Sequence, residues 1–195
     1  MEDLALHVLD IAQNAAEAGA TRISVRIDED PVADRLSIEV GDNGRGMDAD
    51  MARRATDPFC TTRETRRVGL GLALLRQAAE AAGGRLTITS QPGQGTTVTA
   101  TFQLTHVDRA PLGDLETTVL VLLASHPALD VEWSHRRGGR DYALATADLR
   151  AALDGAPLAS PEGIALARRA VRRGETELAG EPERAGRERT QGRAG

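Results

Sequence analysis

A short segment, Asp42-Asn43-Gly44-Arg45-Gly46-Met47, combines a carboxylate with two glycines and a methionine, shortly after a predicted strand at residues 36–40. A carboxylate at the end of a strand can accept a hydrogen bond from the exocyclic amine of adenine. Gly44 and Gly46 would let the backbone approach a planar ring without a Cβ clash, and Met47 would add soft apolar surface against it. Asn-Gly after a strand is also the commonest signal for a tight hairpin, so this segment by itself leaves a plain turn open.

A second group of polar residues lies on the helix that we predict over residues 4–18, before Gly19. Asp10, Asn14 and Glu17 form a stripe at helical spacing beside the apolar positions of that helix. A stripe of this kind is usually the solvated side of an amphipathic helix. Asn is nevertheless unfavourable inside a helix because its amide competes for backbone hydrogen bonds, whereas its oxygen can bind Mg²⁺, a cation held mainly through substrate phosphates. Asn14 is therefore a candidate magnesium ligand.

The third segment, Gly69-Leu70-Gly71-Leu72, opens an apolar helix that we predict to end near Ala82, before Gly83-Gly84. Amide groups at a glycine-rich helix N-terminus are available to a phosphate. The same four residues could instead form a loose turn or a close-packed helix start. The order of all three segments along the chain favours the phosphate interpretation.

A helix with Asn14, a strand followed by Asp42 and its glycines, and a Gly-x-Gly helix are followed by Pro92-Gly93-Gln94-Gly95-Thr96-Thr97 and an alternating strand. In this order the chain resembles, over residues 4–104, the GHKL superfamily of gyrase, heat-shock chaperone, histidine kinase and mismatch-repair (MutL) ATPases. The resemblance implies a Bergerat-type ATP-binding fold, an α/β two-layer sandwich in which helices cover one face of a mixed sheet. It also implies ATP and Mg²⁺ as cofactors.

The resemblance assigns a role to each motif. It implies that Asn14 binds magnesium, that Asp42 recognises adenine, and that Thr96 supports the adenine site. The residues around Asp42 and those that open the Gly-x-Gly helix would contact the nucleotide, the latter at its phosphate end: Gly44, Gly46, Met47, Gly69, Leu70, Gly71 and Leu72.

Residues 48–68 would form a lid over this pocket. Within them, Asp57-Pro58-Phe59-Cys60-Thr61-Thr62-Arg63 resembles the Phe-containing box of sensor histidine kinases. Thr61, Thr62 and Arg63 are therefore expected contacts of the γ-phosphate, with a geometry that depends on lid closure. The chain contains no lysine, and the guanidinium fork of Arg63 suits phosphate oxygens. A surface loop anchored by a phenylalanine is the alternative.

Two positions of the first helix depart from the histidine kinase pattern. Kinases of that family usually carry Asn one turn before the magnesium Asn and Lys three residues after it, where this chain has Asp10 and Glu17. The acid resembles the ATPase and serine-kinase branches, in which it orients or deprotonates the attacking water or hydroxyl, so Asp10 is the candidate catalytic residue. Asp is one methylene shorter than the Glu of those branches, and we expect slow or partner-stimulated hydrolysis.

Only three residues precede the first predicted helix, so we expect a histidine kinase-like ATP-binding domain without a phosphoacceptor histidine domain. Its partner would be a separate protein or phosphoacceptor, on which it acts as a slow ATPase switch or as a trans-acting protein kinase. Two alternatives remain open. One is a serine/threonine kinase of the anti-sigma-factor type, and the other is a non-catalytic interaction module regulated by nucleotide.

Composition excludes several other classes of protein. The net charge of −5 and an aromatic content of 2% argue against a nucleic-acid groove built from basic patches and stacking rings. The sequence shows neither a signal peptide nor an apolar run long enough for membrane insertion, and Cys60 is the only cysteine, which agrees with a reducing compartment. We therefore expect a cytoplasmic protein without nucleic-acid partners, and homodimerisation stays open.

The chain length suits one principal domain with an appendage. We predict the ATP-binding domain over residues 1–107, a small C-terminal α-β-β-α unit over 108–158, a short helix within 159–174, and a disordered tail over 175–195. In the C-terminal unit, Gly138-Gly139 would form a hairpin turn and Thr146 would cap the last helix.

Overall fold

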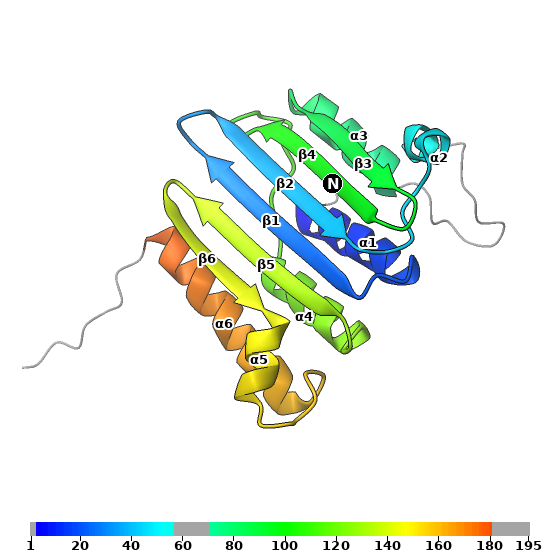
Figure 1. Ribbon diagram of the computed structural model, residues 1–195. Coiled ribbons are helices and arrows are strands. Elements are labelled where there is room, and N and C mark those ends of the chain that lie inside the picture. The colour runs from blue at the N-terminus through cyan, green and yellow to red at the C-terminus, as the bar shows by residue number, and fades with distance from the viewer. Residues whose placement is uncertain (1–2, 57–70, 181–195) are drawn as a thin grey trace, which may run out of the picture.

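The computed structural model describes residues 3–56 and 71–180. Figure 1 shows a mixed sheet of six strands in the order β3-β4-β2-β1-β5-β6, with the helices behind it. Only β1 and β5 are parallel; the other neighbouring strands are antiparallel. The strands are β1 (Arg22–Asp30), β2 (Arg35–Asp42), β3 (Arg85–Gln91), β4 (Gly95–Gln103), β5 (Asp130–Arg137) and β6 (Arg140–Ala145).

The helices pack on one face of the sheet because the strands alternate between buried apolar and more exposed polar side chains. On β1, for example, Ile23, Val25 and Ile27 are buried, while Arg26 between them is exposed. This arrangement confirms the predicted two-layer α/β fold. The helices are α1 (Leu4–Glu17), α2 (Ala49–Arg54), α3 (Gly71–Ala81), α4 (Leu115–Ser125), α5 (Thr146–Ala152) and α6 (Pro161–Ala179).

Helix α1 positions the predicted polar stripe. Its N-terminus is capped by Asp3, whose Oδ1 accepts a hydrogen bond from Leu6 N at 3.0 Å, and Gly19 follows its end with a φ of +80°. Leu4, Val8 and other apolar residues of one face are buried in the core. The stripe with Asp10 and Asn14 is therefore left half-buried at the side of the helix.

The predicted C-terminal α-β-β-α elements are present, but they extend the first sheet. Strand β5 pairs with β1 over its whole length, and residues of both parts of the chain belong to one hydrophobic core. The predicted boundary near residue 107 therefore does not coincide with a break in either sheet or core. The Gly138-Gly139 turn is confirmed: both residues have positive φ, and Arg137 pairs with Arg140 across the hairpin.

Two C-terminal expectations require correction. Thr146 does not cap α5; it is the first residue of that helix, and its buried Oγ1 accepts a hydrogen bond from Val131 N at 2.9 Å. The last helix is also longer than predicted, since α6 continues to Ala179. Residues 175–179 are held there by contacts with the sheet that local composition does not reveal, whereas residues 181–195 of the predicted tail lie outside the described ranges.

Among the described helices, none combines the length and the apolar content that crossing a bilayer requires.

Candidate functional site

The segment after β2 does not form a hairpin, because the chain continues into α2. Asp42 is half-buried at the end of β2, and its Oδ1 accepts a hydrogen bond from Gly44 N at 2.7 Å. Asn43 Oδ1 accepts hydrogen bonds from Thr21 N at 2.9 Å and Arg22 N at 2.8 Å. These hydrogen bonds hold the loop of residues 42–47 against the connection between α1 and β1. They thereby fix the position of the Asp42 carboxylate.

The two glycines of this loop allow close packing against other parts of the backbone. A Cβ at Gly44 would lie 3.1 Å from Ala18 O, just beyond the end of α1. A Cβ at Gly46, whose φ is +64°, would lie only 1.9 Å from the backbone oxygen of Gln91, the last residue of β3. In the structure these glycines therefore bring the loop against α1 and the β3–β4 turn, while their approach to a base stays a prediction.

Met47 and Thr96 are connected through a serine that sequence reasoning missed. Ser90 Oγ accepts a hydrogen bond from Met47 N at 2.8 Å and lies 2.9 Å from both Thr96 Oγ1 and Gly95 O. The sequence did contain a signal, because Ser90 is the polar member of the less exposed register of β3, after Leu86 and Ile88. Ser90 joins the loop after β2 to the end of β4.

The predicted magnesium and catalytic residues meet at the side of α1. Asn14 Nδ2 donates a hydrogen bond to Asp10 Oδ2 at 3.3 Å. Because this contact uses the amide nitrogen, it orients the Asn14 carbonyl oxygen, Oδ1, as a potential ligand. The first residue of α3, Gly71, lies against the same carboxylate: a Cβ added there would be 1.8 Å from Asp10 Oδ2.

Helix α1 links the two groups of residues. Ala18 N donates to Asn14 O at 2.9 Å, and Ala18 O accepts from Arg45 N at 3.1 Å. The structure therefore places one end of the predicted adenine loop a single helical turn from the predicted magnesium ligand.

The remaining predicted residues divide into two sets. Leu72, in the first turn of α3, is half-buried and packs against the hydrophobic core. Thr62, Arg63, Gly69 and Leu70 lie outside the described residues, as does most of the predicted lid. The described part of that lid, residues 48–56, contains α2, whose N-terminus is capped by Asp48.

The donor set fits a magnesium ion that shares its coordination with phosphate. Among the described residues, no cluster of three or more His, Cys, Asp or Glu side chains could hold a metal. Asn14 would supply one neutral oxygen, beside the Asp10 carboxylate. Such a site depends on phosphate and water for its other ligands, which is the usual way in which proteins bind Mg²⁺ with nucleotides.

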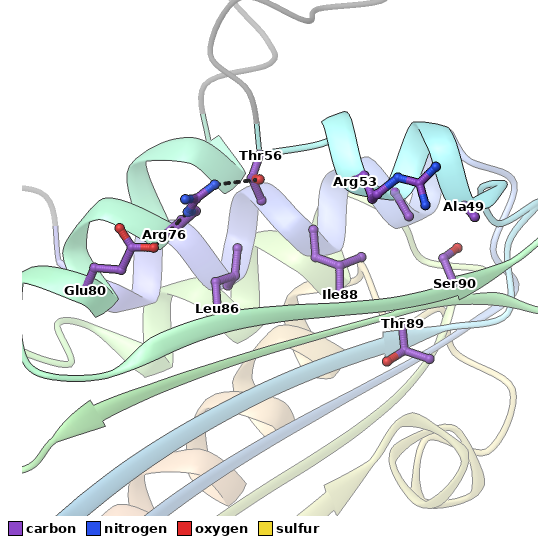
Figure 2. A pocket seen from close by; sticks show the side chains of 10 residues that line it. Ala49, Arg53, Thr56, Arg76, Glu80, Leu86, Ile88, Thr89 and Ser90 are labelled. Carbon is purple, nitrogen blue, oxygen red and sulfur yellow. Dashed lines mark hydrogen bonds and ion pairs between the residues drawn. The ribbon is translucent and has the colours of Figure 1, made fainter.

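A cavity of about 580 Å³ lies between α2, α3 and β3, with Ser90 in its lining (Figure 2). Arg76 is one of the residues that line the cavity. Its guanidinium group donates hydrogen bonds to two other lining residues, to Glu80 Oε1 at 2.8 Å and to Thr56 Oγ1 at 3.3 Å. Of the predicted site residues that the structure describes, none lines this cavity, although Ser90, which contacts Met47 and Thr96, does. We therefore do not assign the nucleotide to it.

A separate buried polar cluster lies where α6 covers β5 and β6. His135, with 3% of its surface exposed, contacts Glu175 Oε1 through Nδ1 at 3.0 Å and Glu29 Oε1 through Nε2 at 3.1 Å. Burial opposes the charged imidazole, but the hydrogen bonds to both carboxylates outweigh it and raise the His135 pKa to about 9. Tyr142 Oη donates to Glu175 at 2.7 Å, and burial followed by this bond raises the Tyr142 pKa. These groups satisfy one another, so the cluster is structural.

Comparisons with known proteins identify histidine kinases that are similar to part of this chain. Over 93 residues the chain is 37% identical to the signal transduction histidine-protein kinase AtoS of Escherichia coli, a match of 47% of this chain and 15% of AtoS. It is 35% identical over 97 residues to the sensor histidine kinase AruS of Pseudomonas aeruginosa, a match of 47% of this chain and 10% of AruS. The chain thus spans only a small part of the length of these kinases.

The fold also has a counterpart among solved structures. The N-terminal domain of a DNA repair protein matches 74% of this chain, and 53% of that chain is covered, with a TM-score of 0.51 and 17% sequence identity. That likeness supports the fold alone. The model of the histidine kinase-, DNA gyrase B- and HSP90-like ATPases matches residues 2–106, which include every predicted site residue. The chain therefore belongs to this family of ATPases and carries its kinase-like ATP-binding domain.

Proposed function

We propose that this domain binds ATP together with Mg²⁺ and acts on a separate protein, as a slow ATPase switch or as a trans-acting protein kinase. The observation that carries the proposal is the contact between Asp10, Asn14 and Gly71, which gathers a carboxylate, a neutral oxygen ligand and a helix N-terminus at one place. These are the groups needed to orient a nucleophile, to hold a cation and to bind phosphate.

Adenine recognition is assigned to Asp42. One of its oxygens, Oδ1, is used by Gly44 N. Within the described ranges the other oxygen, Oδ2, accepts no hydrogen bond, so it can accept one from the exocyclic amine of adenine. Thr96 supports this end of the site from β4 through its contact with Ser90.

Titration with ATP in the presence of Mg²⁺ tests the binding site. Asp42→Asn is the sharpest variant, because its amide oxygen can still accept from Gly44 N while its NH₂ group cannot accept from adenine. We expect ATP affinity to fall about tenfold or more, and Asp141→Ala, an exposed change on β6, to leave it unchanged. No saturable binding by the wild type, or equal affinity of the wild type and Asp42→Asn, would contradict the proposal.

For the fate of the γ-phosphate, we favour transfer to a hydroxyl of the partner as the second candidate. The acid at position 10 supports it, since the resemblance associates an acid before the magnesium Asn with the serine-kinase branch. Recovery of acid-stable phosphate on a co-purified protein would support this chemistry, whereas acid-labile phosphate would favour a histidine acceptor. Nucleotide binding without multiple turnovers would instead point to the non-catalytic interaction module.

We further propose a cytoplasmic location and a protein rather than a nucleic-acid partner. The single cysteine and the net negative charge support these assignments. Size-exclusion chromatography with light scattering, with and without ATP, would establish whether a second copy of the chain is the partner.

A further inference from the structure

Gly71 occupies a position where helix geometry alone gives no reason for glycine. It is the first residue of α3 and does not have the positive φ that favours glycine elsewhere in this chain. Alanine is the better residue within a helix, since glycine loses more conformational freedom on folding. The reason for glycine at position 71 must therefore come from its surroundings.

Those surroundings are the carboxylate of Asp10. A Cβ at position 71 would lie 1.8 Å from Asp10 Oδ2 and 2.9 Å from Asp10 Cγ, both closer than non-bonded atoms can approach. All three of the nearest atoms to that Cβ belong to Asp10. Any side chain at position 71 therefore excludes the Asp10 carboxylate from its present place.

Displacing the Asp10 carboxylate would also change the orientation of the Asn14 side chain. The oxygen that Gly71 accommodates, Asp10 Oδ2, is the one that accepts the hydrogen bond from Asn14 Nδ2. A carboxylate that rotates away from a new Cβ gives up this bond, and the Asn14 amide then loses the contact that orients its Oδ1. Position 71 thus controls two side chains of α1 from a different helix.

We infer that Gly71 is a positioning residue that acts through Asp10. Its missing side chain lets the carboxylate sit against the first turn of α3, where the helix dipole also favours a negative charge. Asp10 in turn orients the magnesium ligand Asn14. The inference rests on the proposed function for the roles of Asp10 and Asn14, but the contact itself is independent of them.

A double-mutant cycle tests this inference with four proteins: the wild type, Gly71→Ala, Asp10→Ala and the double variant. In the wild-type background, Gly71→Ala should weaken binding of ATP with Mg²⁺ about tenfold, because Asp10 is displaced and Asn14 is no longer oriented. In the Asp10→Ala background no carboxylate remains to collide with the new methyl group. There Gly71→Ala should weaken binding much less than it does in the wild type, and the Tm should be equal or higher.

Gln13→Ala provides the matched control, since it shortens a neighbouring side chain of α1 outside this contact, and its effect should add to that of Gly71→Ala. An equal loss of affinity from Gly71→Ala in both Asp10 backgrounds, or no loss in the wild type, would overturn the inference. If Gly71→Ala does not fold, recovery of folding by Asp10→Ala supports it, and an unfolded double variant contradicts it. If the wild type binds no ATP, the proposed function fails, while the four Tm values still report the coupling between Asp10 and Gly71.

Discussion

Short polar side chains organise the site by holding backbone in place. Asn43 fixes the loop after β2 to the start of β1, and Ser90 fixes the same loop to the β3–β4 turn. Neither Asn43 nor Ser90 is predicted to contact the nucleotide. The positions of Asp42 and Thr96 therefore depend on neighbouring residues that are not themselves predicted to contact the nucleotide.

Ser90→Ala should loosen this arrangement. It removes the acceptor of Met47 N and the partner of Thr96 Oγ1, so we expect unfolding free energy to fall by about 1 kcal/mol and ATP affinity to fall several-fold. Urea denaturation and ATP titration measure the two effects. Ser37→Ala is the control. Ser37 is on β2, on the face of the sheet opposite to Ser90, so its substitution should change neither the unfolding free energy nor the ATP affinity appreciably.

Asp10→Asn separates binding from chemistry. The new amide oxygen can still accept from Asn14 Nδ2 and has the same size beside Gly71, so ATP affinity should stay within a few-fold of the wild type. Loss of the carboxylate should reduce phosphate release or transfer by about 10²-fold or more. A radiolabelled γ-phosphate assay would measure this, and equal turnover by both proteins would rule out catalysis by Asp10.

At the scale of elements, α1 carries the predicted residues Asp10 and Asn14, and α6 packs on β6 at the edge of the sheet. Helix α6 is amphipathic and docks on β6, where Gly174 is buried against the Tyr142 ring and Glu175 joins the His135 cluster. Arg168 and Arg172 of α6 also pair with Glu116 of α4. These long-range contacts explain why α6 continues beyond its predicted end.

The His135 cluster makes stability depend on pH. The His135 pKa is raised from 6.5 to about 9 on folding, so its contribution is complete below pH 6.5 and is lost as the pH rises to about 9. The hydrogen bond to His135 lowers the Glu29 pKa. Burial opposes the charged form of Glu175, but its hydrogen bonds to His135 and Tyr142 outweigh burial and lower the Glu175 pKa. The carboxylates therefore contribute stability above their unfolded pKa of 4.5, which is lost on acidification.

We expect unfolding free energy to decrease between about pH 6.5 and 9 in urea denaturation. Arg137 Nε also lies 3.7 Å from Glu29 Oε1. His135→Gln should flatten the dependence, whereas His126→Gln at the end of α4 should preserve it. A wild-type stability that is constant over this range would contradict the assignment of a charged His135.

At the scale of the whole molecule, the described residues after 107 share one sheet and one hydrophobic core with the predicted nucleotide-site residues. Strand β5 pairs with β1, and the single tryptophan, Trp133 on β5, is buried in the shared core. Because the described elements share one hydrophobic core, we expect them to unfold cooperatively. The described C-terminal elements thus enlarge the ATP-binding domain.

Nucleotide binding should therefore stabilise the whole described structure. Trp133 fluorescence and far-ultraviolet circular dichroism should report one coincident unfolding transition. ATP with Mg²⁺ at 100 times its dissociation constant should raise the unfolding free energy by about 2.7 kcal/mol for both probes. Asp42→Asn is the control, since at the same ATP concentration its stabilisation should be smaller. Two separate transitions, with only one shifted by ATP, would show that β5 unfolds independently.

The sequence alone predicted features encoded within single elements or short motifs. The apolar period of residues 4–18 and the glycine after them predicted α1, and the two glycines before Arg140 predicted the β5–β6 hairpin. The order of the nucleotide motifs predicted the two-layer fold and the family. Such signals are local because periodicity, turn conformation and capping depend on neighbouring residues.

The tertiary structure decided which segments meet. No local pattern indicated that β5 would pair in parallel with β1. Nor did any pattern indicate that Glu175 would extend α6 by bonding to His135, or that the Thr146 hydroxyl would accept a hydrogen bond from Val131 N of β5. The same holds for the site, where the sequence marked Asp10 and Gly71 separately but gave no sign that they touch. The physical reason is that these contacts join residues far apart in the chain, whose approach is set by packing of the whole core.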